Sequence, residues 1–200
     1  MQILDKEYFL NDDVVFLAQD MLGKIIQTKI DKAICSGMIV ETEAYRAPED
    51  KASHAYNNKY TIRTSTMSSE GGIAYIYFVY GFHNMFNVVT GPAGIPHAIL
   101  IRAIEPLSNT EEMMIRRGFE NQNVELTNGP GKLCKALGIT REFNGIDLTD
   151  TKTEISILSA DIHIKKENLL STPRIGVAYA QEYAQKLWRF RIKGNKWAGK

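Results

Sequence analysis

Residues Met38–His54 read MIVETEAYRAPEDKASH, and the first half of this stretch alternates in character. In a β-strand every second side chain points to the same face of the sheet. The alternation predicts one face with Ile39, Glu41, Glu43 and Tyr45, and another with Met38, Val40, Thr42 and Ala44. The second face is apolar enough to pack on a core, whereas the first places two carboxylates beside an aromatic ring. An edge strand with two solvent-exposed glutamates would explain the same pattern.

The totals indicate an ordinary globular protein. The 200 residues, of which 44% are hydrophobic and 24% charged, suit one domain of ordinary size or at most two small ones, and we expect a single domain, 1–200. The two cysteines, Cys35 and Cys134, are far apart, which argues against a structural zinc site or a disulfide framework and fits a reducing compartment. The start, MQILDKEYFL, has no pattern of a secretory signal. We therefore expect a protein that is not secreted, placed in the cytoplasm or nucleoid if the source is prokaryotic.

Residues 71–101 contain no formal charge, but glycines, Pro92 and polar side chains interrupt them. A membrane span needs about 20 predominantly apolar residues in sequence. We interpret this stretch as buried strands, and we expect no contact with a membrane.

Charge is distributed unevenly although the net charge is only +1. From Ile164 to Lys200 there are nine basic and two acidic residues. The nine are Lys165, Lys166, Arg174, Lys186, Arg189, Arg191, Lys193, Lys196 and Lys200. A basic segment on a nearly neutral protein suggests that one face binds a polyanion, although a solvated basic tail is the alternative.

Periodicity and turn residues predict strands and helices in alternation, which is typical of an α+β fold. We expect helices at Asp12–Leu22, Asn109–Gly118 and in the residues before Gly138. We expect strands at Lys24–Ile30, Ala33–Tyr45, Ile73–Tyr80, Met85–Thr90, Pro96–Pro106, Ile155–Lys165 and Leu187–Lys193. The first two strands should form an antiparallel pair, the third and fourth a hairpin that turns at Gly81–Asn84, and Arg46–Thr66 a loop.

Two side chains stand out against these elements. Arg102 lies inside a buried-looking strand, where an unpaired charge is very costly, so we expect Glu43 to be its partner. Alternatively, Arg102 reaches a sheet edge and solvent. Tyr80 lies at the hairpin turn, where its own sheet is poorly placed to bury it.

Several motifs are absent or incomplete. The turn at Leu126–Leu133, LTNGPGKL, lacks the spacing of a nucleotide-binding P-loop, and no GxSxG or HExxH motif is present. The helix start within this turn, with its free N–H groups and nearby lysine, would still suit a backbone phosphate.

The order of several short blocks resembles the alkyladenine (3-methyladenine) DNA glycosylase family. The blocks are VETEAY (40–45), PED (48–50) with His54, YIYFVYG (75–81) with Asn87, LIRAIEP (100–106), LTNGPGKLCKALGI (126–139), RIGVAYA (174–180) and LWRFRIKGN (187–195). The resemblance covers nearly the whole chain. It implies a single domain around a curved antiparallel sheet with a protruding hairpin, unlike the helix-hairpin-helix glycosylases. It also implies a monomeric enzyme that excises damaged purines from double-stranded DNA without a metal or other cofactor.

The resemblance also implies roles for particular residues. Glu43 would be the general base that activates water, and Arg102 and the Ile175 carbonyl would hold that water. Tyr80 would be the wedge that replaces a base flipped out of the duplex. Tyr45, His54 and Tyr77 would line a slot that favours cationic 3-methyl or 7-methyl purines, and Asn87 would exclude bulky exocyclic amines.

Other functions remain open from the residues alone. Glu41 and Glu43 lie two residues apart on a strand, which would suit a two-carboxylate glycoside hydrolase acting on free sugars. A metal site formed by Glu41, Glu43 and His54 is another reading. A non-catalytic nucleic-acid-binding module would use the same aromatic and basic side chains, but it would leave a buried Glu43–Arg102 pair unexplained.

Overall fold

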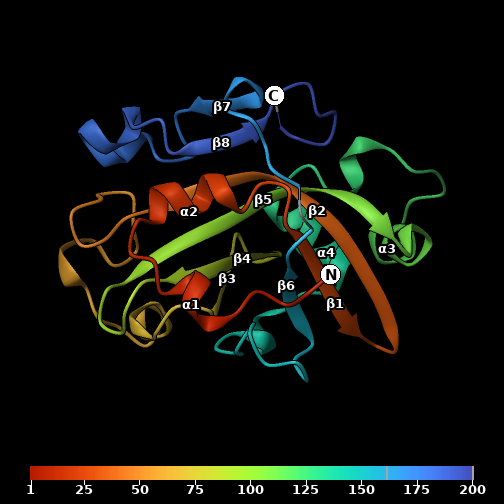
Figure 1. Cartoon of the computed structure of the whole chain (residues 1–200), viewed down its shortest axis with the longest axis horizontal. Helices are drawn as coiled ribbons and strands as arrows, with labels where there is room; N and C mark the ends of the chain where they lie inside the picture. The colour runs from red at the N-terminus through yellow and green to blue at the C-terminus, as the bar shows by residue number, and fades with distance from the viewer. Residues whose placement is uncertain (161, 200) are drawn as a thin grey trace.

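A computed structural model describes residues 1–160 and 162–199, which form one eight-stranded antiparallel sheet with short helices around it (Figure 1). The strands are β1 (Ile25–Ile30), β2 (Ala33–Tyr45), β3 (Ala74–Val79), β4 (His83–Thr90), β5 (His97–Ser108), β6 (Ile155–Leu158), β7 (Leu169–Thr172) and β8 (Arg189–Ile192). The helices are α1 (Lys6–Phe9), α2 (Val14–Asp20), α3 (Thr110–Arg117) and α4 (Pro130–Leu137). Short 3₁₀ segments are η1 (Tyr56–Asn58), η2 (Ser65–Ser68), η3 (Val124–Leu126), η4 (Arg141–Phe143), η5 (Lys166–Asn168) and η6 (Ala178–Gln185). The α+β class is confirmed.

The long strand β2 is the point where the sheet branches. Its first half pairs with β1, its residues Glu41–Glu43 pair with β8, and β5 follows its opposite side from Ser36 to Tyr45. The strand order is β3-β4-β5-β2-β1-β6, while β8 carries β7. Figure 1 shows β2 curving along this path. The two glutamates therefore lie between paired strands, and the edge-strand interpretation is wrong.

Two irregularities in the pairing of β2 with β5 aim the side chains of the site. Ile39 pairs with Ile104 and Glu41 with Ala103, so Val40 is an extra, unpaired residue in β2. The next pair is Thr42 with Ile101, which leaves Arg102 as an extra residue in β5. Such bulges bend a strand and redirect its side chains. Ile39 and Val40 consequently both pack in the main core, and the predicted grouping of Ile39 with Glu41 is wrong.

Beyond the bulge, alternation along β2 holds to the end of the strand. Val40 and Ala44 pack in the main core, and the Thr42 hydroxyl donates a hydrogen bond to the Ala18 carbonyl at 2.6 Å. The other side chains of this segment belong to the charged and aromatic face that the sequence predicts.

The predicted helices form where their end signals lie. The Asp13 carboxylate accepts a hydrogen bond from the backbone N–H of Phe16 and begins α2. Gly118, in the left-handed region at φ 72°, ends α3, and Pro130 begins α4. Helices α2 and α4 both pack against β5 and supply apolar side chains to the main core. Among the described residues, no helix combines the length and the apolar character needed to cross a bilayer.

The predicted β3–β4 hairpin is confirmed, with a tighter turn than expected. Ladder pairs run from Ala74–Val88 to Val79–His83, so β4 begins two residues before Met85. Tyr80 and Gly81 both have positive φ, 54° and 76°, which closes the turn. The tip therefore carries Tyr80 itself.

The prediction for the strand after Ile155 is wrong in length. β6 ends at Leu158, which pairs with Ile25 at the first residue of β1. Beyond that point β1 offers no further backbone partner, and the Ser159 N–H bonds instead to the Gln2 carbonyl. Position 161, inside the predicted strand, lies outside the described residues, as does Lys200 of the basic segment.

Candidate active site

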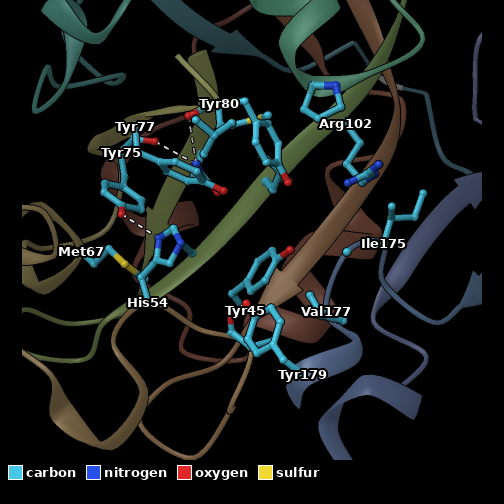
Figure 2. A pocket seen from close by; sticks show the side chains of 18 residues that line it. Tyr45, His54, Met67, Tyr75, Tyr77, Tyr80, Arg102, Ile175, Val177 and Tyr179 are labelled. Atoms are coloured by element: carbon cyan, nitrogen blue, oxygen red, sulfur yellow. Dashed lines mark hydrogen bonds between the residues drawn. The ribbon is translucent and has the colours of Figure 1, made fainter. Parts of the chain in front are cut away.

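A cavity of about 260 Å³ opens beside the end of β2 (Figure 2). Aromatic side chains from β2, the loop after it, the β3–β4 hairpin and η6 line it. They are Tyr45, His54, Tyr75, Tyr77, Tyr80 and Tyr179. The structure thus brings together side chains that are as much as 134 positions apart in the chain. The predicted aromatic slot is present as a cavity wall.

Glu43 lies at the base of this wall with a fully buried side chain. Among the described residues three groups contact its carboxylate. The Ile175 N–H donates to Oε1 at 2.8 Å, the Tyr45 hydroxyl donates to Oε2 at 2.8 Å, and Arg102 Nη1 lies 3.2 Å from Oε2. All three groups are donors, which suits an ionised carboxylate because it only accepts. Tyr45, Arg102 and Ile175 themselves line the cavity, so Glu43 lies directly behind its surface.

The protonation state of Tyr45 supports its role as a hydrogen-bond donor to Glu43. Burial, and then the negative charge of Glu43, raise the pKa of the Tyr45 hydroxyl well above its usual value of 10. The phenol therefore keeps its proton at any physiological pH and donates it to Glu43. Tyr45 both forms cavity wall and orients the carboxylate.

Arg102 connects Glu43 to a second carboxylate, Glu41. Its Nε donates to Glu41 Oε1 at 2.8 Å, and Arg189 Nε donates to the same oxygen at 2.7 Å. The Gly199 N–H donates to Glu41 Oε2 at 2.6 Å. Burial opposes the charge of Arg102, but Glu43 and Glu41 outweigh it and raise the Arg102 pKa further. The predicted Glu43–Arg102 pair is confirmed, and Glu41 fixes the guanidinium that completes it.

Ile175 contacts Glu43 through its backbone N–H. The family resemblance implies that its carbonyl holds the attacking water, which stays a prediction. The N–H contact depends on Arg174, whose guanidinium makes a bidentate pair with Asp50 at 2.5 and 2.8 Å and donates to the Ala44 carbonyl at 2.8 Å. The same group stacks 4.8 Å from the Tyr45 ring. Arg174 thereby holds the 174–175 backbone against the end of β2.

Asp50 and Arg174 form a buried ion pair beside the site that sequence reasoning missed. Both side chains are fully buried. Arg174 was counted with the basic residues expected to face a polyanion, and that assignment is wrong because Asp50 pairs with it inside the protein. The same assignment is wrong for Arg189, because it pairs with Glu41 inside the protein. The available signal was the position of each arginine within a mostly apolar run, RIGVAYA and LWRF.

Other basic residues of the C-terminal segment do remain at the surface. Lys165, Lys166, Lys186, Lys193 and Lys196 are exposed. Binding of a polyanion by this segment would therefore have to use these lysines, because Arg174 and Arg189 are buried.

Asn87 and Tyr80 both lie on the β3–β4 hairpin, but Asn87 is buried and Tyr80 is exposed. Asn87 is buried in the cavity wall, and its amide donates to the Tyr75 and Met85 carbonyls at 3.0 and 3.1 Å. Tyr80 is 84% exposed at the tip, and Phe82, which the sequence analysis did not single out, is 67% exposed beside it. The two tip rings are 6.4 Å apart. The hairpin thus places an aromatic projection next to the cavity mouth.

His54 stands edge-on to Tyr77, with ring centroids 4.6 Å apart, and its Nδ1 lies 2.9 Å from the Tyr75 hydroxyl (Figure 2). Burial, followed by the positive charges of Arg63 and Lys59, lowers the pKa of His54 from 6.5 to about 4. The imidazole is therefore neutral at physiological pH.

This lowered pKa predicts a pH-dependent stability. The unfolded chain binds a proton at His54 below pH 6.5, whereas the folded chain binds it only near pH 4. The stability that the neutral His54 contributes to the fold is therefore complete above pH 6.5 and is lost as the pH falls toward 4. We expect wild type to lose on the order of 2 kcal/mol more unfolding free energy than His54→Gln between pH 7 and 4. Urea denaturation at each pH measures the difference, with His163→Gln as the exposed control. Equal pH dependence in wild type and His54→Gln would contradict the assignment.

The metal alternative does not fit the donors present. Guanidinium groups contact both Glu41 and Glu43, and His54 contacts Tyr75 and Arg63 instead of either glutamate. Within 1–160 and 162–199, no group of three His, Cys, Asp or Glu side chains is placed to hold a metal ion. The engagement of Glu41 with two arginines also argues against its use as a second catalytic carboxylate.

Comparison with known proteins agrees with this site. A family model described as methylpurine-DNA glycosylase (MPG) matches residues 8–196. A Chlamydia abortus protein is 49% identical over 195 residues, covering 95% of this chain and 98% of its own length. A Bacillus cereus protein is 39% identical over 198 residues, with 96% and 97% coverage. Both relatives carry the provisional name 3-methyladenine DNA glycosylase.

The family resemblance drawn from the motifs is thereby confirmed. The matched region contains the branched sheet, the aromatic cavity and the buried glutamate with its arginine. A non-catalytic binding module would leave the buried Glu43–Arg102 pair unexplained. The chain belongs to the methylpurine-DNA glycosylase family and is a DNA glycosylase, a hydrolase that acts on N-glycosyl bonds.

Proposed function

We propose that this protein removes alkylated purines such as 3-methyladenine and 7-methylguanine, and the deaminated purine hypoxanthine, from double-stranded DNA. It acts as a monomer in the cytoplasm or nucleoid and begins base excision repair. The names of the relatives support the substrate class. The observation that carries the mechanism is a buried carboxylate, Glu43, held by donors that line an aromatic cavity.

The target nucleotide must leave the duplex before the cavity can receive it. An enzyme cannot reach a glycosidic bond inside stacked DNA, so the base is flipped out at a cost of a few kcal/mol. An inserted side chain offsets part of that cost by filling the vacated stack. Tyr80 suits this role because it projects from the hairpin tip beside the cavity mouth.

The cavity wall favours a planar cation. Tyr45, His54 and Tyr77 present aromatic surface to it, and a base methylated at N3 or N7 of the purine carries a positive charge. Cation–π attraction is worth about 0.5–2 kcal/mol, so the slot binds such a base more tightly than a neutral one. Asn87, fixed by two backbone carbonyls, would limit exocyclic amines at the purine edge.

Bond cleavage follows from the position of Glu43. A carboxylate has about four acceptor positions, and the three donors present leave Oε1 able to accept a hydrogen bond from water. As the C1′–N bond of a methylated purine breaks, its electron pair neutralises the cationic base, whereas neutral hypoxanthine takes up a proton from solvent water as it leaves. In both cases the negative charge of Glu43 stabilises the oxocarbenium-like sugar. The water oxygen bonds to C1′ and its proton passes to Glu43. The products are a free base and an abasic sugar.

Simple hydrolysis, without strand cleavage, is the expected outcome. Strand cleavage by this class of chemistry uses an amine that forms a Schiff base with the sugar. Among the described residues that line the cavity there is no lysine.

Methylated DNA provides the direct test of the function. The purified protein, incubated with duplex DNA treated with a methylating agent, is expected to release 3-methyladenine and 7-methylguanine, which chromatography separates. DNA containing hypoxanthine tests the deaminated substrate in the same way. Intact bases after prolonged incubation with excess enzyme would overturn the proposal.

Tyr80→Ser is expected to weaken base flipping. Loss of the ring leaves the vacated stack unfilled, and one stacked aromatic ring contributes about 1–3 kcal/mol, which corresponds to roughly 5- to 150-fold in the flipping equilibrium. A fluorescent base analogue next to the lesion reports the flipped population. Phe16→Ser, which removes another exposed ring that does not line the cavity, should leave the signal at the wild-type level. An unchanged signal in Tyr80→Ser would remove the wedge role.

A further inference from the structure

Arg63 contacts aromatic side chains of the cavity, among them His54 and Tyr77, although it does not itself line the cavity. Its guanidinium carbon lies 4.8 Å from the centre of the Tyr77 ring, and its Nη2 lies 3.2 Å from His54 Nε2. Arg63 therefore packs behind the part of the cavity wall where His54 contacts Tyr77. The mechanism described above gives it no role.

Hydrogen-bond chemistry fixes the protonation of His54 from this geometry. A guanidinium has only N–H donors, so Nε2 of His54 must accept and cannot carry a proton. The proton of the neutral ring is then on Nδ1, which donates to the Tyr75 hydroxyl 2.9 Å away. The Tyr75 hydroxyl can donate or accept, so it would tolerate either tautomer. Arg63 is the partner that discriminates between them.

We propose that Arg63 is a positioning residue that holds His54 in the neutral Nδ1–H form, so that this wall of the cavity accepts a cationic purine. The inference rests on the proposed function for the nature of the base. Its physical reason is that an imidazolium at this position would repel a positively charged base, whereas a neutral ring offers only its aromatic surface.

The charged and titratable groups around His54 also favour its neutral form. Titratable and charged groups that face it are Tyr75 and Tyr77 from β3, and Lys59 and Arg63 from its own loop. These include no carboxylate that would stabilise an imidazolium. Burial comes first among the causes that lower the His54 pKa, and the charge of Arg63 comes second.

The backbone that carries Arg63 is fixed although its side chain reaches the surface. Thr64 is 3% exposed, and its hydroxyl donates to the Lys59 carbonyl at 2.8 Å and accepts from the Thr61 N–H at 2.9 Å. The Ser65 N–H also closes the turn on the Thr61 carbonyl at 2.8 Å. This self-bonded turn keeps the guanidinium within reach of His54.

Nitrogen-15 NMR of the imidazole ring tests the inference without any substrate. Wild type is expected to show a protonated Nδ1 and a bare Nε2 at pH 7.5. Arg63→Met should shift the ring toward the Nε2–H form and raise the pKa of His54, while Arg63→Lys, which keeps a cationic donor, should restore the wild-type pattern. Lys59→Met removes a neighbouring charge but keeps the Arg63 contact, so its tautomer should match wild type. An Nε2–H ring in wild type would overturn the inference.

The pH profile of base release provides the functional readout. Between pH 7.5 and 5, single-turnover release of 7-methylguanine by Arg63→Met should fall on the order of tenfold more than release by wild type, and Arg63→Lys should follow wild type. Parallel profiles for Arg63→Met and wild type would overturn the link to the cationic base. If wild type released no base at all, the proposed function would fail, whereas the NMR result would still decide the role of Arg63.

Discussion

Glu43→Gln is expected to reduce the rate of base release by roughly 10²- to 10⁴-fold, because an amide cannot take a proton from the attacking water. The substitution also removes the negative charge that faces the sugar as its bond to the base breaks. Glutamine has nearly the shape of glutamate, so the cavity and its aromatic wall remain. Binding of DNA that contains a lesion should therefore survive while chemistry is lost.

Single-turnover kinetics on methylated duplex DNA measure the loss, and fluorescence anisotropy measures binding of the same DNA. Glu142→Gln makes the same chemical change at an exposed position on η4 and should react at the wild-type rate. Excision by Glu43→Gln at a rate within a few-fold of wild type would remove Glu43 from the catalytic role.

Asp50→Ala is expected to destabilise the protein by about 3–5 kcal/mol, because it leaves the Arg174 guanidinium buried without its counter-charge. The effect should extend to catalysis, since Arg174 holds the backbone that places the Ile175 N–H against Glu43. Base release should consequently fall even at temperatures where the variant remains folded.

Urea denaturation compares Asp50→Ala with Glu49→Ala, a matched control from the adjacent position. Glu49 pairs with Arg46 at 2.8 Å, but both side chains are largely exposed, and such surface pairs contribute about 0–1 kcal/mol. A loss in Asp50→Ala no larger than in Glu49→Ala would show that the buried pair does not hold this region together.

The parts of the site that could be predicted from sequence are those set by short-range pattern. Alternation along β2 placed Glu43 and Tyr45 on one face, and the turn residues after β3 placed Tyr80 at a hairpin tip. The charge of Arg102 within a buried strand required a partner, and Glu43 is one of its two partners. Each of these inferences needed only neighbours in sequence and the cost of an unpaired charge.

What could not be predicted depends on contacts between distant segments. Asp50 and Arg174 are 124 positions apart, and no local pattern shows that they meet. A bulge of one residue in each of β2 and β5 moved Ile39 into the core and set the direction of Arg102, although the periodicity around them is regular. The burial of Arg174 and Arg189 follows from such contacts, which is why their charge alone suggested a surface role.

The branching of the sheet at β2 has a consequence for how the molecule fluctuates. Residues 41–43 have backbone partners on both sides, in β5 and β8, so transient opening there requires much of the sheet to come apart. The amide hydrogens of these residues should exchange with solvent only about as fast as the whole protein unfolds. The hairpin tip around Tyr80 lies outside that resistant unit, so its amide hydrogens should exchange faster than those of residues 41–43.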